Sequence, residues 1–397
     1  MEVTYREVPE DRREEFHDLL HYAFRPEDGH PEYDLEEGPG EVGARRGLFD
    51  GDDLAVVCRH YWFDARVRGT WVRAPGLSAV ASPPEHRHGG LVRRLLVESL
   101  AEYRDRESAL SILWPFKYSF YRKYGWGTCS RFTEITCEPD HLSAVAEDAI
   151  GEFRDATAAD WEALDAIYRD DAAEWDLALD RSEAFWRHRV FESWRKDPFV
   201  YVWELDGEPR GYVVYTVEDD DDEDGKTFRV YEVAARDETA YRHCLRFAYY
   251  HEAQVARVKI HGEPHARLLD RLPEQWETEC TLSRGPMARI VDVPTAIEAL
   301  EYPVDLEGSV RIGVKDPLVD WNDATFEVSF EDGAATCRQV DAEPDVECSI
   351  AHLSQLYVGY RSLDRLQRET DLTIDDAVTD RLDAAFPPRD TFLREGF

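Results

Sequence analysis

Lysine is scarce in this sequence: only six of the 47 basic residues are lysine, and the rest are arginine. Acidic residues number 84, so the 397-residue chain carries a formal net charge of −37. This charge repels phosphate groups and excludes nucleic acid or an anionic membrane as the expected partner. It also destabilises a compact chain at low salt, an effect that molar salt screens. The composition therefore predicts a protein from an extreme halophile.

Paired cysteines and long apolar runs are also missing. The seven cysteines are an odd number, and no two of them have C-x-x-C spacing, so a disulfide framework is not expected. No apolar signal region opens the chain, and no run of about 18 apolar residues could cross a membrane. We expect a reduced, soluble and cytoplasmic protein.

The length predicts two or three domains, and 43% hydrophobic residues are enough to form their cores. The alternation of strand and helix patterns predicts an α/β (α+β) fold. A first unit covers residues 1–148, with a last strand near Arg131 to Thr136. A second unit, 149–286, repeats its order of elements without its glycines, and a third covers 287–397. The repeat indicates a degenerate internal duplication.

A glycine turn between a strand and a helix is the first candidate site. Residues 80–94 read V-A-S-P-P-E-H-R-H-G-G-L-V-R-R. The free N–H groups of a helix N-terminus attract anions, and glycine lets a phosphate approach the backbone. Arg87, Arg93 and Arg94 add positive charge, so we interpret the turn as a pyrophosphate site. The alternative is an ordinary turn with surface arginines, and neither G-x-G-x-x-G nor G-K-[ST] is present.

An aromatic segment follows at residues 118–127, Y-S-F-Y-R-K-Y-G-W-G. Its tyrosines recur every three residues, a pattern that by itself is more typical of core packing. A tyrosine phenol, with an ordinary pKa of about 10, can donate a proton to a leaving group.

These segments resemble those of a known superfamily. P-E-H-R-x-x-G-L is similar to the acetyl-CoA signature R/Q-x-x-G-x-G/A of the GNAT N-acetyltransferases, although Val92 stands where the last small residue belongs. The aromatic segment resembles the GNAT box F-Y-x-x-x-G-[FWY]. The order of units, the segment S-I-A-H-L-S-Q-L-Y-V-G-Y and the ending F-L-R-E-G-F resemble the Eis (enhanced intracellular survival) acetyltransferases over essentially the whole chain.

The resemblance implies two tandem GNAT folds, the second degenerate, followed by a domain with a sterol-carrier-protein fold. It implies acetyl-CoA as co-substrate, no metal, an amine acceptor (aminoglycoside-like, polyamine or lysine) and a hexamer. It makes Tyr121 the proton donor to the CoA sulfur and the Phe397 carboxylate the base. The residues that it assigns to acetyl-CoA are Val80, Ala81, Ser82, Arg87, His88, Gly89, Gly90, Val92 and Arg93.

Two other interpretations remain. The third unit could hold an apolar ligand, with the GNAT units as a non-catalytic CoA-binding scaffold. The acidic stretch Asp220–Gly225 imitates the start of an EF-hand loop, but the twelfth position is Tyr231 instead of glutamate. A solvated acidic turn is the better interpretation of that stretch.

Overall fold

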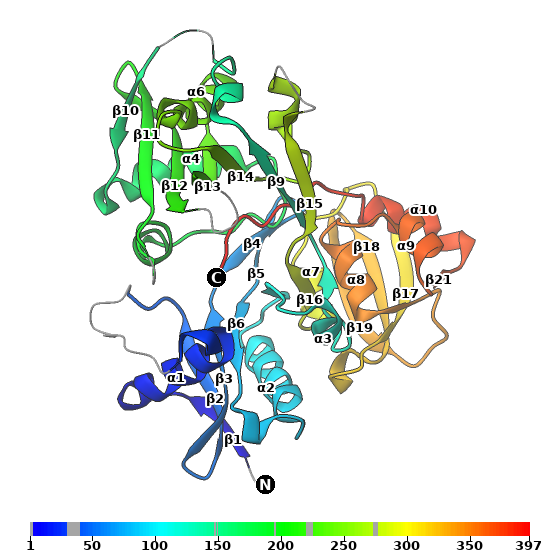
Figure 1. The fold of residues 1–397 in the computed structure, drawn as a ribbon. Coiled ribbons are helices and arrows are strands. Elements are labelled where there is room, and N and C mark those ends of the chain that lie inside the picture. The colour runs from blue at the N-terminus through cyan, green and yellow to red at the C-terminus, as the bar shows by residue number, and fades with distance from the viewer. Residues whose placement is uncertain are drawn as a thin grey trace.

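A computed structural model of the protein describes residues 3–29, 40–146, 148, 150–193, 196–219, 225–272 and 277–397. Three mixed sheets with helices against them form three domains, which confirms the α/β (α+β) class (Figure 1). In the part of the chain described, no helix is long and apolar enough to cross a membrane.

The first domain is a twisted sheet with a helix on each face. Its strands in spatial order are β1 (Val3–Glu7), β2 (Ala44–Asp50), β3 (Asp53–Tyr61), β6 (Gly76–Ala81), β7 (Leu110–Leu113), β16 (Met287–Ile290) and β8 (Gly127–Thr128). The helices are α1 (Arg13–Phe24), α2 (Leu91–Asp105) and the short α3 (Tyr118–Arg122). Successive side chains of a strand point to opposite faces. Val56 of β3 accordingly packs in the cluster that contains α2, whereas Val57 packs in the cluster with Phe16 of α1.

The second domain repeats this plan. Its strands in spatial order are β10 (Glu152–Asp155), β11 (Phe199–Leu205), β12 (Glu208–Asp219), β13 (Lys226–Ala235), β14 (Arg257–Gly262), β9 (Arg131–Cys137) and β15 (Glu279–Arg284). The buried face of α4 (Trp161–Ala172) packs in one core cluster and that of α6 (Glu238–Arg246) in another. Between them in sequence lie α5 (Glu183–Phe185) and a π-helical turn (Trp186–Val190).

The two sheets exchange strands. The strand that we expected to complete the first unit, near Arg131 to Thr136, is β9, and it pairs with β14 and β15 of the second sheet. That expectation was wrong, because apolar alternation shows that a strand is buried but not which strand it pairs with. In return β16 enters the first sheet between β7 and β8. The boundaries predicted at residues 148 and 286 stay a prediction, since the sheets themselves are interleaved.

A hairpin of the first domain contacts the second domain directly. It consists of β4 (Asp64–Val67) and β5 (Thr70–Arg73). The Arg66 amide donates to the Ala178 carbonyl at 2.9 Å, and the Leu177 amide donates to the Arg66 carbonyl at 2.7 Å. These backbone bonds fix the relative position of the two domains.

The third domain is a smaller sheet with helices packed against it. Its strands in spatial order are β19 (Ala334–Val340), β18 (Thr325–Glu331), β17 (Gly308–Lys315), β20 (Val346–Ser349) and β21 (Thr373–Ile374). Its helices are α7 (Val293–Glu298), α8 (Ile350–Tyr357), α9 (Leu363–Glu369) and α10 (Asp376–Ala385). After α10 the chain leaves this domain, and the C-terminal segment, 386–397, ends at the centre of the molecule between the other two domains (Figure 1).

Candidate active site

The edge of strand β6 opens the candidate site. Strand β6 pairs along its length with β3, but with β7 only at Gly76 opposite Ile112. Ala79 has a φ of 54°, and the register against β3 shifts at this point. Beyond Gly76 this edge of β6 therefore has no partner strand among the described residues. Its backbone groups face the space from which β7 has diverged, where an extended ligand can pair with them.

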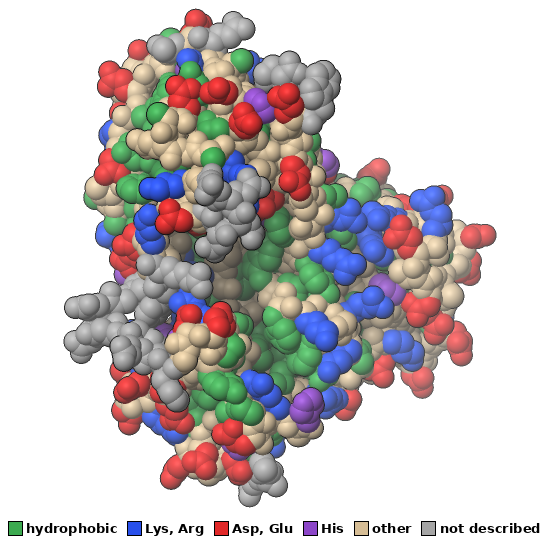
Figure 2. Space-filling model, in the orientation of Figure 1, with side chains coloured by type: hydrophobic (Ala, Val, Ile, Leu, Met, Phe, Trp, Pro, Cys, Tyr) green, Lys and Arg blue, Asp and Glu red, His purple; other side chains and the backbone are tan. Residues whose placement is uncertain are grey.

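A cavity of about 710 Å³ lies at this edge. It is lined by eight of the nine residues that the resemblance assigned to acetyl-CoA: Val80, Ala81, Ser82, Arg87, His88, Gly90, Val92 and Arg93. Gly89 does not line it. The space-filling view shows hydrophobic side chains in the central hollow of the molecule, with Lys and Arg gathered beside it (Figure 2).

The N-terminus of α2 is built to accept an anion. Gly90, its N-cap, has a left-handed φ of 79°, and His88 before it has a φ of 63°. No side chain caps the helix, and its first turn contains no acidic residue. The first-turn amides are therefore unpaired donors with a partial positive charge at the cavity wall. A pyrophosphate group would satisfy them.

The arginines of this turn divide into two groups. Arg87 donates from Nε to the Ser82 carbonyl at 3.1 Å and lies 5.7 Å from the Tyr22 ring, so it remains at the cavity. Arg94, which we expected to add charge to the site, instead donates to the Val3 carbonyl at 2.6 Å. It lies one turn along α2 and faces β1, so that part of the expectation was wrong.

Tyr121 lies on the short helix α3, whose Phe120 lines the cavity, but Tyr121 itself is not among the lining residues. This side chain is 4% exposed, and the rings of Phe116, Phe120 and Trp126 lie 5.2–6.1 Å from it. Its hydroxyl forms no hydrogen bond with a described residue. Burial, and then the neighbouring Cys58, raise the pKa of the Tyr121 phenol. The group is thus a protonated donor at neutral pH, without a hydrogen-bond acceptor among the described residues.

The glycine of the aromatic segment, Gly125, lies in close contact with Arg289. Its φ is 92°, and a Cβ there would overlap the guanidinium of Arg289. Arg289 comes from the exchanged strand β16, is fully buried, and donates to the Tyr124 carbonyl at 2.6 Å. Its other nitrogen pairs with the buried Asp316. The strand exchange thus supports the turn that holds Tyr121.

Phe397 lies at the other end of β6. Its ring is 5.1 Å from the Phe63 ring and 5.4 Å from the Tyr61 ring, and it covers Gly76, where a Cβ would come within 2.6 Å of it. The adjoining Gly396 lines a second cavity of about 510 Å³ between the first two domains. At about 3.3 Å per residue, β6 separates Gly76 from Val80 by roughly 13 Å. The C-terminus and the large cavity therefore lie toward opposite ends of the same strand.

The sequence missed part of the cavity wall. Phe24 of α1 and Phe116 before α3 are 51% and 65% exposed, and both line the cavity with Phe120, Lys123 and Tyr124. Lys123 and Tyr124 fell inside the quoted aromatic segment, but nothing marked them as wall residues. Phe24 carries no signal, because its position depends on the packing of α1.

The second domain closes the equivalent anion position. Helix α6 is capped by Asp237, whose carboxylate accepts from the Ala240 amide, and Glu238 stands in its first turn. A carboxylate occupies the place that an anion would take. This helix N-terminus is therefore not open to an anion as that of α2 is.

No group of three or more potential metal ligands exists among the described residues. Most of the acidic stretch considered above, residues 220–224, lies outside them.

Comparisons with known proteins agree with this architecture. Residues 4–129 and 177–290 each match a model of an acetyltransferase (GNAT) domain, and residues 293–394 match a sterol carrier protein domain. The chain is 26% identical to the N-acetyltransferase Eis of Mycobacterium tuberculosis, over 87% of this chain and 86% of that protein. It is 24% identical to an uncharacterized N-acetyltransferase of Streptomyces griseus, over 82% of each.

Two solved structures share the fold over the whole chain. A GCN5-related N-acetyltransferase from Anabaena variabilis has a TM-score of 0.85 at 22% identity, with 100% of both chains covered. Eis1 from Mycobacterium abscessus has a TM-score of 0.76 at 20% identity, again with 100% of both chains covered.

The fold and the matched domains define an enzyme of the GNAT acetyltransferase class with a C-terminal sterol carrier domain. Within that class, the chain is similar to the N-acetyltransferase Eis over 87% of its length. The predicted tandem GNAT folds and sterol-carrier-like domain are confirmed, and the interpretation as a non-catalytic scaffold is not supported.

Proposed function

We propose that the protein transfers the acetyl group of acetyl-CoA to an amine by direct attack on the thioester. The observation that carries this proposal is the unpaired edge of β6, which runs into a cavity closed by the uncapped N-terminus of α2. Amides of an open strand suit the extended pantetheine arm, and the helix N-terminus suits the pyrophosphate. Acetyl-CoA supplies an activated acyl group, and no metal is required.

The residues of the chain take complementary roles in this proposal. Backbone amides between Val80 and Ser82 polarise the thioester carbonyl as negative charge develops on it. The Tyr121 hydroxyl donates its proton to the departing sulfur. A terminal carboxylate has an ordinary pKa near 3.5 and is therefore a weak base. The Phe397 carboxylate binds the acceptor's ammonium group and helps to pass its proton to water.

The acceptor enters from the second cavity, which borders the C-terminal segment. The acceptor classes remain those of the resemblance: an aminoglycoside-like amine, a polyamine or a lysine. A homo-oligomer, with a hexamer as the expected form, belongs to the same proposal.

The binding-protein alternative depends on the third domain. Large side chains occupy the interior of that domain, among them Tyr302, Phe326, Phe330 and Phe386, all at most 6% exposed. This packing favours a structural role for the domain over storage of an apolar ligand.

The test is amine-dependent release of CoA from acetyl-CoA in molar KCl, with the acetylated product identified by mass. Tyr121→Phe should lower kcat by about 10²-fold while the Kd for acetyl-CoA stays unchanged, because only a proton donor is removed. Tyr103→Phe is the matched control, since Tyr103 is also buried and its hydroxyl also lacks a hydrogen-bond partner among the described residues. Unchanged turnover in Tyr121→Phe would refute the assignment of the proton donor. Absence of any amine acetylation by the native protein, despite acetyl-CoA binding, would refute the function.

A further inference from the structure

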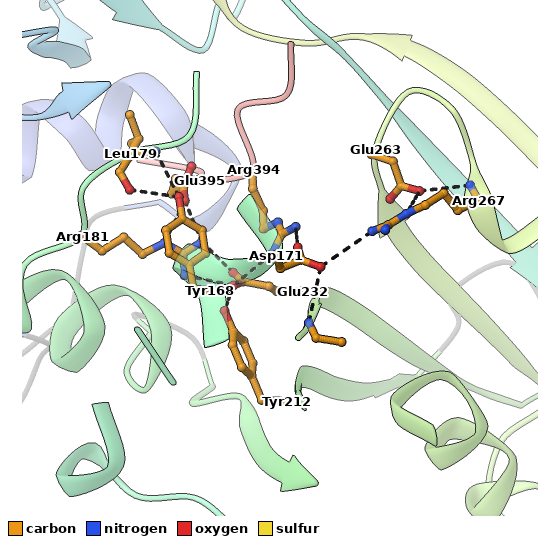
Figure 3. A network of polar contacts seen from close by, with 11 residues as sticks. Tyr168, Asp171, Leu179, Arg181, Tyr212, Glu232, Glu263, Arg267, Arg394 and Glu395 are labelled. Carbon is orange, nitrogen blue, oxygen red and sulfur yellow. Dashed lines mark hydrogen bonds and ion pairs between the residues drawn. The ribbon is translucent and has the colours of Figure 1, made fainter. Parts of the chain in front are cut away.

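A buried network of charged residues joins the C-terminal segment to the second domain (Figure 3). At its centre is Arg181, which is 3% exposed. Its Nε donates to Oε1 of Glu395 at 2.8 Å, and its two terminal nitrogens donate to the Glu232 carboxylate at 2.9 and 3.0 Å. One arginine side chain thus holds a carboxylate of β13 and a carboxylate of the segment that ends at Phe397. We call Arg181, Glu232, Arg394 and Glu395 the tail clamp.

Neighbouring groups complete the tail clamp. Arg394 pairs with Asp171 of α4 at 2.5 Å and lies 3.7 Å from Glu232. The Tyr212 hydroxyl donates to Glu232, and the Tyr168 ring lies 3.7 Å from the Arg181 guanidinium. Burial tends to raise the pKa of Glu232, but Arg181 and Arg394 lower it overall, so this carboxylate is charged.

The first domain holds the backbone of the same segment. Trp114 Nε1 donates to the Glu395 carbonyl at 2.7 Å, and the Phe397 ring packs on Tyr61 and Phe63. From the π-helical turn of the second domain, Arg189 donates to the Gly396 carbonyl at 3.2 Å. The last three residues are therefore held by both domains at once.

This arrangement restricts the terminal carboxylate. Two residues of extended chain span at most about 7 Å. A fixed Glu395 side chain therefore limits the volume in which the carboxylate of Phe397 can lie. Stability alone explains the network poorly, because apolar residues of similar volume often replace a buried ion pair without loss of stability. A positioning role is compatible with buried charges of this geometry, because they fix the orientation of the groups that they pair.

We infer that the tail clamp positions the Phe397 carboxylate for the acceptor amine, and that the second GNAT domain, whose own anion position is closed by Asp237, serves to hold it. Arg181, Glu232 and Glu395 are positioning residues, since they act through the terminal carboxylate. The inference rests on the proposed function, in which that carboxylate binds the acceptor's ammonium group.

The experiment is a double-mutant cycle between Glu395 and the terminal carboxylate. Glu395→Gln keeps the shape of the side chain but removes the charge that Arg181 holds. A chain extended by one glycine after Phe397 keeps every side chain and moves the carboxylate by up to about 3.6 Å. The kcat and KM for amine acetylation, the Kd for acetyl-CoA and the midpoint of urea unfolding are measured for each variant in molar KCl.

We expect Glu395→Gln to lower kcat about tenfold in the native chain and less than twofold in the extended chain, with the Kd for acetyl-CoA unchanged in both. Glu263→Gln is the matched control: Glu263 is a similarly buried carboxylate of the second domain, paired with Arg267 at 3.0 Å and not with the C-terminal segment. It should leave kcat unchanged. Arg181→Lys, which keeps the positive charge but not the three hydrogen bonds, should resemble Glu395→Gln.

Wild-type kcat in Glu395→Gln would overturn the inference. So would an equal loss in the native and extended chains, because a purely structural effect does not depend on where the carboxylate lies. An extended chain with wild-type kcat would remove the terminal carboxylate from the proposed function and the tail clamp's role with it. Failure of the native protein to acetylate any amine would refute the proposed function by a different observation.

Discussion

Replacement of Gly90 by alanine should reduce acetyl-CoA binding and stability, taken together, more than replacement of Gly89. Both glycines are exposed, and a Cβ at either position would have no heavy atom of the described structure within 4 Å. They differ in conformation and place. Gly90 has a φ of 79° and lines the cavity, whereas Gly89 lies outside the left-handed region and does not line it. Comparison of the two alanine substitutions therefore separates the effect of backbone conformation from the effect of an added methyl group.

The magnitude follows from the left-handed conformation. An L-residue with a Cβ pays about 1–2 kcal/mol to adopt it. If the turn keeps its shape, the free energy of unfolding falls by this amount. If the turn relaxes to a negative φ, the first amides of α2 turn away from the ligand, and the same energy appears as weaker binding. At 1.4 kcal/mol per factor of ten, the Kd for acetyl-CoA should rise about tenfold.

Titration calorimetry measures the Kd for acetyl-CoA, and urea unfolding measures the free energy of unfolding. Gly90→Ala should lose a total of about 1–2 kcal/mol divided between binding and stability, and Gly89→Ala should lose less than about 0.5 kcal/mol in either. Equal effects of the two substitutions, or a Gly90→Ala protein with native stability and affinity, would refute the assignment of the α2 N-terminus as the anion site.

Four further predictions concern the ionisable groups of the protein. Arg289→Met leaves Asp316 buried without its cation and should lower the free energy of unfolding by about 3–5 kcal/mol, and Arg289→Met combined with Asp316→Asn should recover part of this loss in urea unfolding. Burial lowers the pKa of His60 from 6.5 to about 3, so between these pH values the unfolded chain binds a proton that the native protein does not. The free energy of unfolding should therefore fall as the pH drops from about 6.5 to 3. His60→Gln should make the denaturant midpoint less dependent on pH in this range. Despite its burial, Glu102 has a pKa lowered from 4.5 to about 2 by Arg46 and Tyr5, so its contribution is complete above pH 4.5 and lost as the pH falls toward 2. With a net charge of −37, the melting temperature should rise steadily from 0.1 M to molar KCl, and a melting temperature independent of salt would contradict the predicted halophilic character.

The sequence could predict the local parts of the site. The turn at residues 87–93 and the box around Tyr121 are each formed by neighbours in the chain, so their spacing carries the information. Local chemistry also distinguished the two GNAT domains, because the second lacks the glycines that the turn of the first contains.

Long-range pairing could not be predicted in the same way. Nothing in residues 131–137 distinguishes a strand of the first sheet from one of the second, since both need the same alternation of buried and exposed side chains. The contact of Arg181 with Glu395 joins residues 214 positions apart, and neither residue belongs to a local pattern. Phe24 reaches the cavity only because of the way α1 packs. Such positions follow from the assembled fold.

The exchange of β9 and β16 also determines when the enzyme can form during its synthesis. The first sheet has a gap between β7 and β8 until residues 287–290 are available, so its N-terminal residues must wait for most of the chain to leave the ribosome. Closure across so long an intervening segment is slow relative to local contacts. A nascent chain interrupted before residue 287 would contain the glycine turn at residues 87–93 without β16, the strand that supports the turn of Tyr121. The first sheet is thus complete only after residue 290 has been synthesised.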